Sequence, residues 1–290
     1  MLVTTIINGL VLGGTYALVA MGLTIQYGIA RIMNLAYGET IIAAAFLAFV
    51  LNGGLGIAPL ASLLIAAPAG FALSYVIYGL MLRPLVRRSG GGAGLEVNSI
   101  LATFGLLFVI QGIMLVLFGG DYISYSYMNF GVDVLGASVA ANRLLALVLA
   151  VILGGGLYLL LTRTLWGTAL RAVAVAPQSA PLVGIDANRA ARFAFALGGA
   201  LATCGGVVIS MYQTFTASSG VIFTMKALIV VILGGVGNLA GALSAGLLLG
   251  LVETLVATYV SPGLTLAAVY HIFLGVLLWR PSGLFGKARR

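Results

Sequence analysis

The sequence predicts an all-α, polytopic helical membrane protein with about 8 to 10 membrane segments and at least one broken helix. Of its 290 residues, 62% are hydrophobic and only 7% are charged, which is more apolar surface than one soluble core can bury. Apolar runs of membrane-spanning length recur from end to end. None shows the alternating pattern of a membrane barrel, so all the spans should be helices.

Hydropathy and helix-breaking residues place eight spans, with each boundary set to within about 2 to 4 residues. The spans cover residues 5–29, 34–52, 57–82, 99–119, 143–161, 192–212, 239–258 and 264–280. No basic stretch precedes the first apolar run, so we expect it to be a retained span and not a cleaved signal peptide. The links are short, and residues 1–290 should therefore form a single transmembrane domain.

The basic residues predict the orientation of the chain in the membrane. Eleven of the 14 lie in the links 83–98 and 162–192 and in the C-terminal tail, which contains Arg280, Lys287, Arg289 and Arg290. These three segments should be cytoplasmic, because cytoplasmic loops are enriched in Lys and Arg. The net charge of +8 therefore indicates topology and not nucleic-acid binding. The segments 120–142 and 213–225 should lie outside.

The stretch "VVILGGVGNLAGALSAGLLLGLVE" (230–253) interrupts two apolar runs. A cytoplasmic C-terminus requires an extra crossing here, and the break falls at Gly234, Gly235, Gly237 and Asn238. The first piece, about 226–236, is too short to span unless it is tilted, extended or seated in a cavity. Two interpretations remain open: a broken helix beside a translocation pathway, or a plain cytoplasmic hairpin between tightly packed helices.

A second interruption reads Asn34-Leu35-Ala36-Tyr37-Gly38 and is similar to Asn238-Leu239-Ala240-Gly241. The similarity could be a remnant of an internal repeat, but four similar residues are weak evidence and favour chance. Glycines at helix-packing spacing, such as the pairs Gly9/Gly13 and Gly246/Gly250, predict close helix contacts.

Few residues could support catalysis or bind a metal. The single histidine, His271, and the single cysteine, Cys204, cannot form a metal cluster or a catalytic triad, and "GLFGKARR" does not match a P-loop. We therefore expect no catalytic residues, no metal site and no cofactor in this chain. Glu253 is the carboxylate expected to be costly within a span; it either lines a pathway or bonds to another helix.

The loop "TRTLWGTALRAVAVAPQSAPLVGIDANRAAR" (162–192) mixes small apolar residues with arginines. Within it, "APQSAPLVG" predicts a short helix capped by Ser179 and closed at Gly184. Such a helix on the cytoplasmic side suggests a docking surface for a partner protein. The alternative is a helix that lies on lipid headgroups.

The chain resembles the permease subunits of branched-chain amino-acid ABC importers, the Liv type, and specifically the first of the two paralogous permeases. The resemblance covers nearly the whole chain. It rests on four stretches in order, "NGLVLGGTYALVAMGLTIQYGIARIMNLAYGE" (8–39), "LRAVAVAPQSAPLVGI" (170–185), "MKALIVVILGGVGNLAGALSAGLLLGLVE" (225–253) and "RPSGLFGK" (280–287).

The resemblance implies an alternating-access permease in a bacterial or archaeal cytoplasmic (inner) membrane. Its implied partners are a second permease, two cytoplasmic ATPases that bind ATP and Mg²⁺, and a substrate-binding protein. The family's cytoplasmic coupling segment corresponds to the loop 162–191, where the residues implied to contact the ATPase are Arg171, Ala180, Leu182 and Gly184. The chain departs from the family at Leu35-Ala36-Tyr37-Gly38, at Ala176 and at Pro181. Because proline lacks a backbone N–H, Pro181 suggests that the coupling helix starts only at Ala180 or is kinked.

The expected function is inward translocation of leucine, isoleucine and valine. Relatives of the family move urea, short amides or aromatic acids, and an ATP-independent carrier or channel is a further alternative. A membrane enzyme would need catalytic groups that this sequence lacks. The predicted substrate pathway consists of small and polar residues that would bind a zwitterion weakly: Asn34, Tyr37, Gly38, Gly234, Gly235, Gly237, Asn238 and Glu253, with Thr103 and Gln111 as further candidates.

Overall fold

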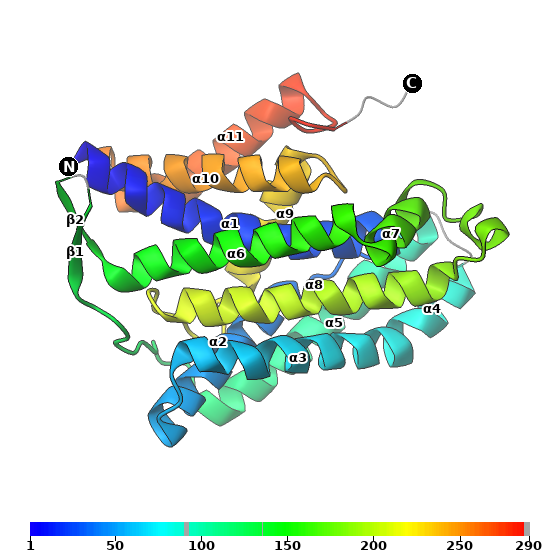
Figure 1. Cartoon of the computed structure of the whole chain (residues 1–290), viewed down its shortest axis with the longest axis horizontal. Helices are drawn as coiled ribbons and strands as arrows, with labels where there is room; N and C mark the ends of the chain where they lie inside the picture. Colours follow the sequence, from blue (N-terminus) through cyan, green and yellow to red (C-terminus); the bar gives the residue numbers. More distant parts are fainter. Residues whose placement is uncertain (90–92, 135, 287–290) are drawn as a thin grey trace.

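The computed structural model describes residues 1–89, 93–134 and 136–286, and nearly all of its regular structure is helical (Figure 1). Eight of the described helices are long and apolar enough to cross a membrane. Their bounds are α1 (Leu2–Ala30), α2 (Tyr37–Leu55), α3 (Pro59–Ile77, continued through one wider turn into α4, Arg83–Ser89), α5 (Ala93–Phe118), α6 (Ala141–Arg163), α8 (Ala187–Ser210), α10 (Leu239–Tyr259) and α11 (Thr265–Trp279). The predicted all-α membrane fold is confirmed.

Two apolar helices are shorter than a membrane span, α7 (Leu165–Val175) and α9 (Gly220–Gly234). Single 3-10 turns cover Ala180–Val183 and Pro262–Leu264. The segment between α5 and α6 contains an antiparallel hairpin that the sequence did not predict. Its strands are β1 (Gly131–Val134) and β2 (Ala137–Ala140), with Gly131 opposite Ala140.

Basic residues gather at one end of the bundle, called the basic end below. They lie near the C-terminal ends of α1, α4, α6 and α11 and around α7. Figure 1 shows α4 and α7 at the end of the bundle that is opposite the N-terminus. The described members are Arg31, Arg83, Arg87, Arg88, Arg163, Arg171, Arg189, Arg192 and Arg280. Lys287, Arg289 and Arg290, which contributed to the orientation prediction, lie outside the described residues. The N-terminus and the β-hairpin lie at the opposite end.

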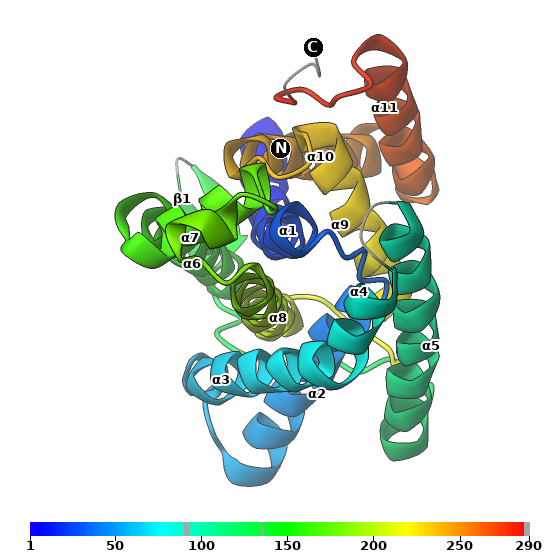
Figure 2. The same cartoon turned by 90° about the vertical axis from the view of Figure 1, so that its right-hand side faces the viewer.

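Helix α1 lies near the centre of the bundle, as the view along the helices shows (Figure 2). Its longest contact is with α10 and depends on glycines. A Cβ atom on Gly250 would lie 2.1 Å from the backbone nitrogen of Gly13, and one on Gly246 would lie 2.6 Å from the Cα of Ala17. The predicted glycine contacts are therefore confirmed, because only residues without a side chain allow these two backbones to approach so closely.

Helices α1, α2 and α3 and the later helices α8, α9 and α10 form two sets that are arranged alike but run in opposite directions. Helix α1 packs on α10, and α8 packs on α3 in a corresponding way. In each set the first long helix is followed by a non-helical stretch that re-enters the bundle, 31–36 after α1 and 211–219 after α8. A shorter helix then starts inside the bundle, α2 in one set and α9 in the other. The suggested match of residues 34–38 with 238–241 is thus wrong for the three-dimensional structure, which relates 31–36 to 211–219.

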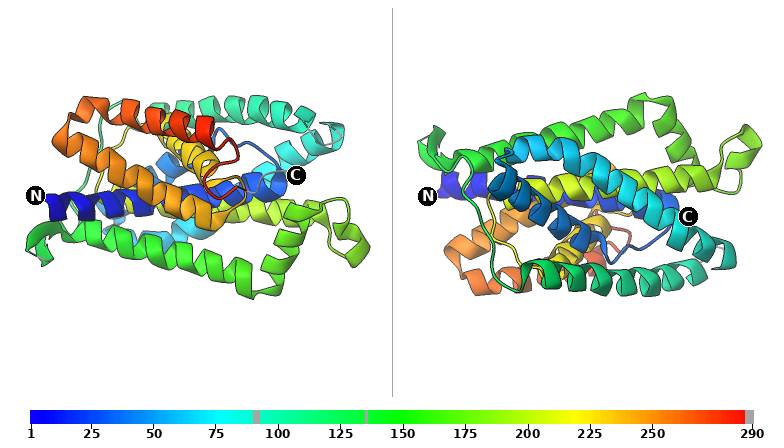
Figure 3. Two further views of the ribbon diagram at one scale, coloured as in Figure 1. Left: turned by 90° about the horizontal axis from the view of Figure 1, so that it is seen from above. Right: turned by 90° about the horizontal axis from the view of Figure 1, so that it is seen from below.

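Four helix boundaries differ from the prediction by five residues or more, and one of them is the start of α8 at Ala187, where residue 192 was predicted. The π-like turn and α4 carry the third helix to Ser89, and α5 starts at Ala93, so most of the predicted link 83–98 is helical. Hydropathy falls at the first arginine, whereas backbone hydrogen bonding continues past it. Helix α9 starts at Gly220, earlier than the predicted residue 226, and crosses the bundle obliquely, as the gold helix of Figure 3 shows. Of the three options predicted for this piece, namely tilted, extended or seated in a cavity, the structure shows the tilted one.

Candidate functional site

The N-termini of α2 and α9 meet inside the bundle, and this contact is called the junction below. The backbone N–H of Gly38 donates to the Thr224 hydroxyl at 2.8 Å, and the same hydroxyl donates to the carbonyl of Leu35 at 3.2 Å. A Cβ atom on Gly38 would lie only 1.9 Å from the carbonyl oxygen of Gly220. The two backbones touch directly, so any side chain at position 38 would force α2 and α9 apart.

Two of the predicted pathway residues beside the junction are buried and hydrogen-bonded. Asn34 donates to the side-chain oxygen of Gln26 at 3.1 Å, and its own oxygen accepts from the N–H of Ala36. The Tyr37 hydroxyl donates to the carbonyl of Val19 at 2.8 Å. These bonds connect the re-entering stretch 31–36 to α1, which gives both side chains a structural role. Their place in a substrate pathway stays a prediction.

Thr103 of α5 holds the same stretch from the other side. Its hydroxyl donates to the carbonyl of Met33 at 3.0 Å and accepts from the N–H of Leu35 at 3.1 Å. The stretch has no helical hydrogen bonds of its own, so these side-chain bonds satisfy backbone groups that would otherwise be unpaired within the membrane.

Glu39, in the first turn of α2, is the residue that the sequence analysis missed. It is completely buried, and neither carboxylate oxygen has a hydrogen-bond partner among the described residues. A Cβ atom on Gly220 would lie 2.3 Å from one carboxylate oxygen and 2.5 Å from the other. The carboxylate therefore lies directly against the first residue of α9. The available signal was its position, five residues into the span predicted to start at residue 34.

The glycine-rich break at 234–238 is a hairpin at the basic end. Gly235 and Gly237 have φ values of 96° and 80°, which side-chain-bearing residues rarely adopt. A Cβ atom on Gly234 would lie 2.4 Å from the carbonyl carbon of Gly241, so α9 and α10 nearly touch at the turn. Asn238 caps α10 by accepting from the N–H of Gly241, and it donates to the carbonyl of Phe285 at 3.1 Å.

The predicted broken helix is therefore present, and its geometry matches the interpretation as a tight hairpin. The assignment of these four residues to a substrate pathway stays a prediction.

Glu253, the carboxylate singled out from the sequence, has two partners. Lys226 of α9 lies 2.7 Å from it, and the Tyr16 hydroxyl donates to it at 3.0 Å. Lys226 also donates to Tyr16. The Lys226 and Glu253 side chains are only 12% and 14% exposed, so this ion pair is shielded from water and joins α9 to α10. The bonds to Tyr16 of α1 and Lys226 of α9 match the interpretation of Glu253 as a partner to other helices, and its place on a pathway stays a prediction.

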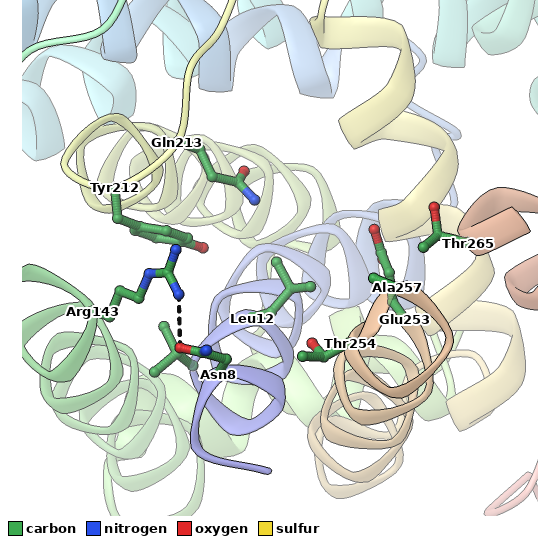
Figure 4. Close-up of a pocket in the computed structure, with 10 residues that line it drawn as sticks. Asn8, Leu12, Arg143, Tyr212, Gln213, Glu253, Thr254, Ala257 and Thr265 are labelled. Atoms are coloured by element: carbon green, nitrogen blue, oxygen red, sulfur yellow. Dashed lines mark hydrogen bonds between the residues drawn. The ribbon is translucent and has the colours of Figure 1, made fainter. Parts of the chain in front are cut away.

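A pocket with a volume of about 240 Å³ opens at the end opposite the basic end, and Glu253 lies on its wall. Arg143, the only described arginine at that end, lies across from it, with Leu12 between them (Figure 4). Arg143 donates to Asn8 at 2.8 Å. A guanidinium and a carboxylate on facing walls, with an apolar residue between, would complement the two charges of an amino acid.

A neighbouring pocket of about 400 Å³ shares Arg143, Tyr212 and Gln213 with the first and is lined mainly by the polar chain between α5 and α6 and after α8. A hydrogen bond of 2.8 Å joins the Tyr212 hydroxyl to Thr15 of α1. Together the two pockets form a polar vestibule.

The loop 162–191 projects from the basic end. Thr164 caps α7 by accepting from the N–H of Gly167 at 3.0 Å, and this helix was not foreseen from the sequence. The short helix predicted at "APQSAPLVG" is a single 3-10 turn that starts at Ala180, as Pro181 suggested, and ends at Gly184 with φ 79°. Ser179 precedes it but makes no side-chain capping bond, so the predicted cap is wrong in that detail.

The coupling residues implied by the resemblance differ in exposure. Ala180 is buried against the bundle, Leu182 is 87% exposed, and Arg171 is exposed with a weak bond of 3.4 Å to Thr168. His271, elsewhere, is exposed and bonds within its own helix to Ala267. Across the described ranges, no group of three or more His, Cys, Asp or Glu side chains could hold a metal ion.

Comparison with known proteins identifies relatives along the full length. The family model described as "Branched-chain amino acid transport system / permease component" matches residues 5–279. The chain is 29% identical to the high-affinity branched-chain amino acid transport system permease protein BraD of Pseudomonas aeruginosa, over 97% of this chain and 95% of that protein. It is 27% identical to the corresponding permease protein LivH of Salmonella typhimurium, over 97% and 94%.

A partial similarity points to a neighbouring group. The autoinducer 2 import system permease protein LsrC of Klebsiella pneumoniae is 35% identical over 54% of this chain and 44% of its own length.

Proposed function

Because the chain belongs to the family of branched-chain amino acid transport permease components, we propose that it is the membrane-spanning subunit of an ATP-driven importer for leucine, isoleucine and valine. The observation that carries this proposal is the family match over residues 5–279, which includes all eight candidate spans within a few residues. The chain is a multi-pass membrane protein and a transport subunit; its substrate, direction and partners are the parts proposed here.

The charge distribution supports inward transport. Nine described arginines at the basic end indicate that this end is cytoplasmic, since cytoplasmic segments are rich in Lys and Arg. The N-terminus and the polar vestibule then face outside, and the described C-terminal residues face the cytoplasm. A vestibule on the outer face is where a substrate-binding protein would deliver its amino acid.

The vestibule chemistry supports an amino-acid substrate. Arg143 and Glu253 on facing walls would interact with the carboxylate and ammonium groups, and Leu12 offers apolar contact to an aliphatic side chain. Both charged groups already have protein partners, Asn8 for the first and Lys226 for the second. Binding should therefore be weak, which suits a subunit that must release what it carries.

The loop 162–191 supports coupling to an ATPase. Leu182 and Val183 are 87% and 72% exposed at the tip of the basic end, where a soluble domain could cover them. Ala180 anchors the turn, and Gly184 adopts the left-handed conformation that reverses the chain. We propose that two ATPases, which bind ATP and Mg²⁺, contact this surface, and that a second permease and a substrate-binding protein complete the complex.

Gentle purification of the tagged chain from its native membrane, with mass spectrometry of its companions, tests the assembly. We expect two ATPases and a second permease. Reconstitution of that complex in liposomes, with the binding protein outside and ATP within reach of the ATPases, should give ATP-dependent leucine uptake that excess urea or phenylalanine does not suppress. ATP-independent uptake by the chain alone would favour a secondary carrier, and suppression by urea or phenylalanine would change the substrate.

The substitution Gly184→Asp tests the coupling surface within the same system. A side chain at φ 79° strains the turn, and the added charge sits beside Val183. We expect ATP hydrolysis without uptake, or loss of the ATPases from the complex. The matched change Gly56→Asp alters another left-handed glycine, with φ 65°, at the end of α2 that lies away from the loop, and should leave coupling intact. Coupled wild-type uptake by Gly184→Asp would contradict the docking assignment.

A further inference from the structure

Glu39 occupies a position that stability alone does not explain. Its carboxylate is fully buried within the membrane domain and has no hydrogen-bond partner among the described residues. An uncompensated carboxylate in the bilayer costs a few kcal/mol. Glu253, the other carboxylate at comparable depth, avoids this cost through Lys226 and Tyr16. We therefore look for a partner of the Glu39 carboxylate that is present only while the protein functions, such as a bound substrate.

The junction lies deep in the domain. Helix α2 starts there and runs for 19 residues toward the opposite end, a length of about 28 Å. Helix α9 starts at the same point and runs 15 residues toward the basic end. Both helices therefore begin inside the membrane, and their N-termini, which carry partial positive charge, face Glu39.

The stretch that leads into α9 indicates which side of the junction faces water. Residues 211–219 re-enter the bundle without helical structure, and Thr214 and Ser218 are exposed on it. Irregular backbone at membrane depth is tolerated where protein or a water-filled path covers it, and not against lipid. Protein or water must therefore cover this face of the junction, and in the proposed complex we place the substrate path there.

Gly220, the first residue of α9, lies against the Glu39 carboxylate directly after this stretch. Because Gly220 has no side chain, the Glu39 carboxylate can occupy the space beside it. A Cβ atom on Gly220 would lie 2.3 to 2.5 Å from the two carboxylate oxygens. A small movement of the N-terminus of α9 away from α2 would expose the carboxylate to the path. No side chain would have to move aside at position 220.

We propose that Glu39 is the counter-ion for the ammonium group of the transported amino acid as it passes the junction. In the state described here, α9 covers the Glu39 carboxylate. When α9 moves away, the ammonium group of the substrate takes the place of α9 beside the carboxylate. The carboxylate neutralises one charge of the zwitterion in the part of the path where water is scarcest. This inference rests on the proposed function and names a residue that contacts the substrate inside the membrane domain.

The first test is the charge-neutral variant Glu39→Gln in the reconstituted complex. We expect leucine uptake to fall at least about tenfold, because one member of a buried charge pair is lost. The melting temperature should not fall, since Glu39 makes no hydrogen bond to lose. The matched control Glu96→Gln changes a carboxylate near the basic end that accepts a bond of 3.3 Å from Tyr27, and should transport normally.

The second test moves the carboxylate to the facing helix. Because the Cβ position of residue 220 nearly coincides with the Glu39 carboxylate, the pair Glu39→Ala and Gly220→Asp places a carboxylate in almost the same spot. We expect this double variant to regain uptake that Glu39→Ala loses. The isosteric pair Glu39→Ala and Gly220→Asn fills the same space without the charge and should stay inactive.

These outcomes separate the inference from the proposed function. Suppose that the wild-type complex takes up leucine and that the two double variants, Glu39→Ala with Gly220→Asp and Glu39→Ala with Gly220→Asn, transport equally. The charge then has no role, and the inference is overturned while the proposed function stands. Normal uptake by Glu39→Gln has the same meaning. If the wild-type complex moves no substrate that bears an amino group, the proposed function fails and the inference fails with it.

Discussion

The chain interrupts its membrane helices at two kinds of place, and the two are built differently. The hairpin between α9 and α10 is rich in glycine, and its capping residue Asn238 is bonded on both sides, to Gly241 and Phe285. The junction between α2 and α9 has one glycine from each helix and a buried carboxylate with no partner among the described residues, Glu39. The hairpin is a satisfied turn at the surface of the bundle, whereas the junction leaves a charged group uncompensated within it.

This difference teaches which kind of interruption indicates function. Glycines at a hairpin allow a sharp turn and close helix packing, and neither needs a ligand. An unsatisfied carboxylate beside irregular backbone at membrane depth is costly, and evolution retains such features where they contact a substrate or an ion. Three test variants, each described below, break or sharpen the comparison, and the largest loss of stability is expected for the ion pair that lies between the two interruptions.

Helix α9 is held between the interruptions by the ion pair of Lys226 and Glu253. The variant Lys226→Met leaves Glu253 buried without its cation, and we expect a loss of stability of about 3 to 5 kcal/mol. The double variant Lys226→Met with Glu253→Leu should recover most of it, because two apolar side chains leave no charge unpaired. Apparent melting temperatures of the purified complex measure both. An unchanged melting temperature for the single variant would show that α9 is anchored elsewhere.

At the junction, Gly38→Leu should be the next most damaging change. Its side chain would collide with the backbone of Gly220 and part the two helix N-termini, at a cost of about 3 kcal/mol. The control Gly53→Leu, in the same helix, adds the same side chain where nothing lies within 4 Å. Yield of folded protein in the membrane compares them. Equal yields would mean that the close contact at the junction is not needed for folding.

At the hairpin, Asn238→Ala removes the cap of α10 and should reduce stability by about 1 kcal/mol. Uptake per folded complex should change little if the hairpin serves only as a turn. The interpretation that places Asn238 on the substrate pathway expects loss of uptake instead. Transport assays normalised to the amount of folded complex decide between these two interpretations. Loss of uptake would show that the hairpin lies on the substrate pathway.

Much of the fold follows from the sequence, since apolar length and the positions of arginines are local properties. The eight spans, the break after Gly234 and the turn that ends at Gly184 were all predicted from neighbouring residues. Helix α7 and the β-hairpin were missed, because short elements outside the membrane leave little trace in hydropathy. The end of the third helix was placed too early and the start of α5 too late, because hydropathy falls at the arginines while helical hydrogen bonding continues past them.

The candidate site was harder to predict because it joins distant parts of the chain. Glu39 appeared in the sequence as one polar residue at the start of an apolar run, and nothing local shows that Gly220 lies against it. Lys226 was placed at the very edge of a short helical piece, so its pairing with Glu253 was not foreseen. Hydropathy gives the length of a segment but not the depth at which it begins, and depth is what makes Glu39 unusual.

The most direct test of this account measures whether the stretch before α9 borders a water-filled path. The single native cysteine, Cys204, is buried, so a cysteine introduced as Ser218→Cys can be labelled selectively in the reconstituted complex. The control Leu64→Cys replaces a side chain of α3 that is 80% exposed on the apolar surface of the bundle. Rapid reaction of Ser218→Cys with a water-soluble maleimide, slowed by leucine-loaded binding protein, together with no reaction of Leu64→Cys, is the predicted result. Failure of Ser218→Cys to react, both with and without ATP, would contradict the account.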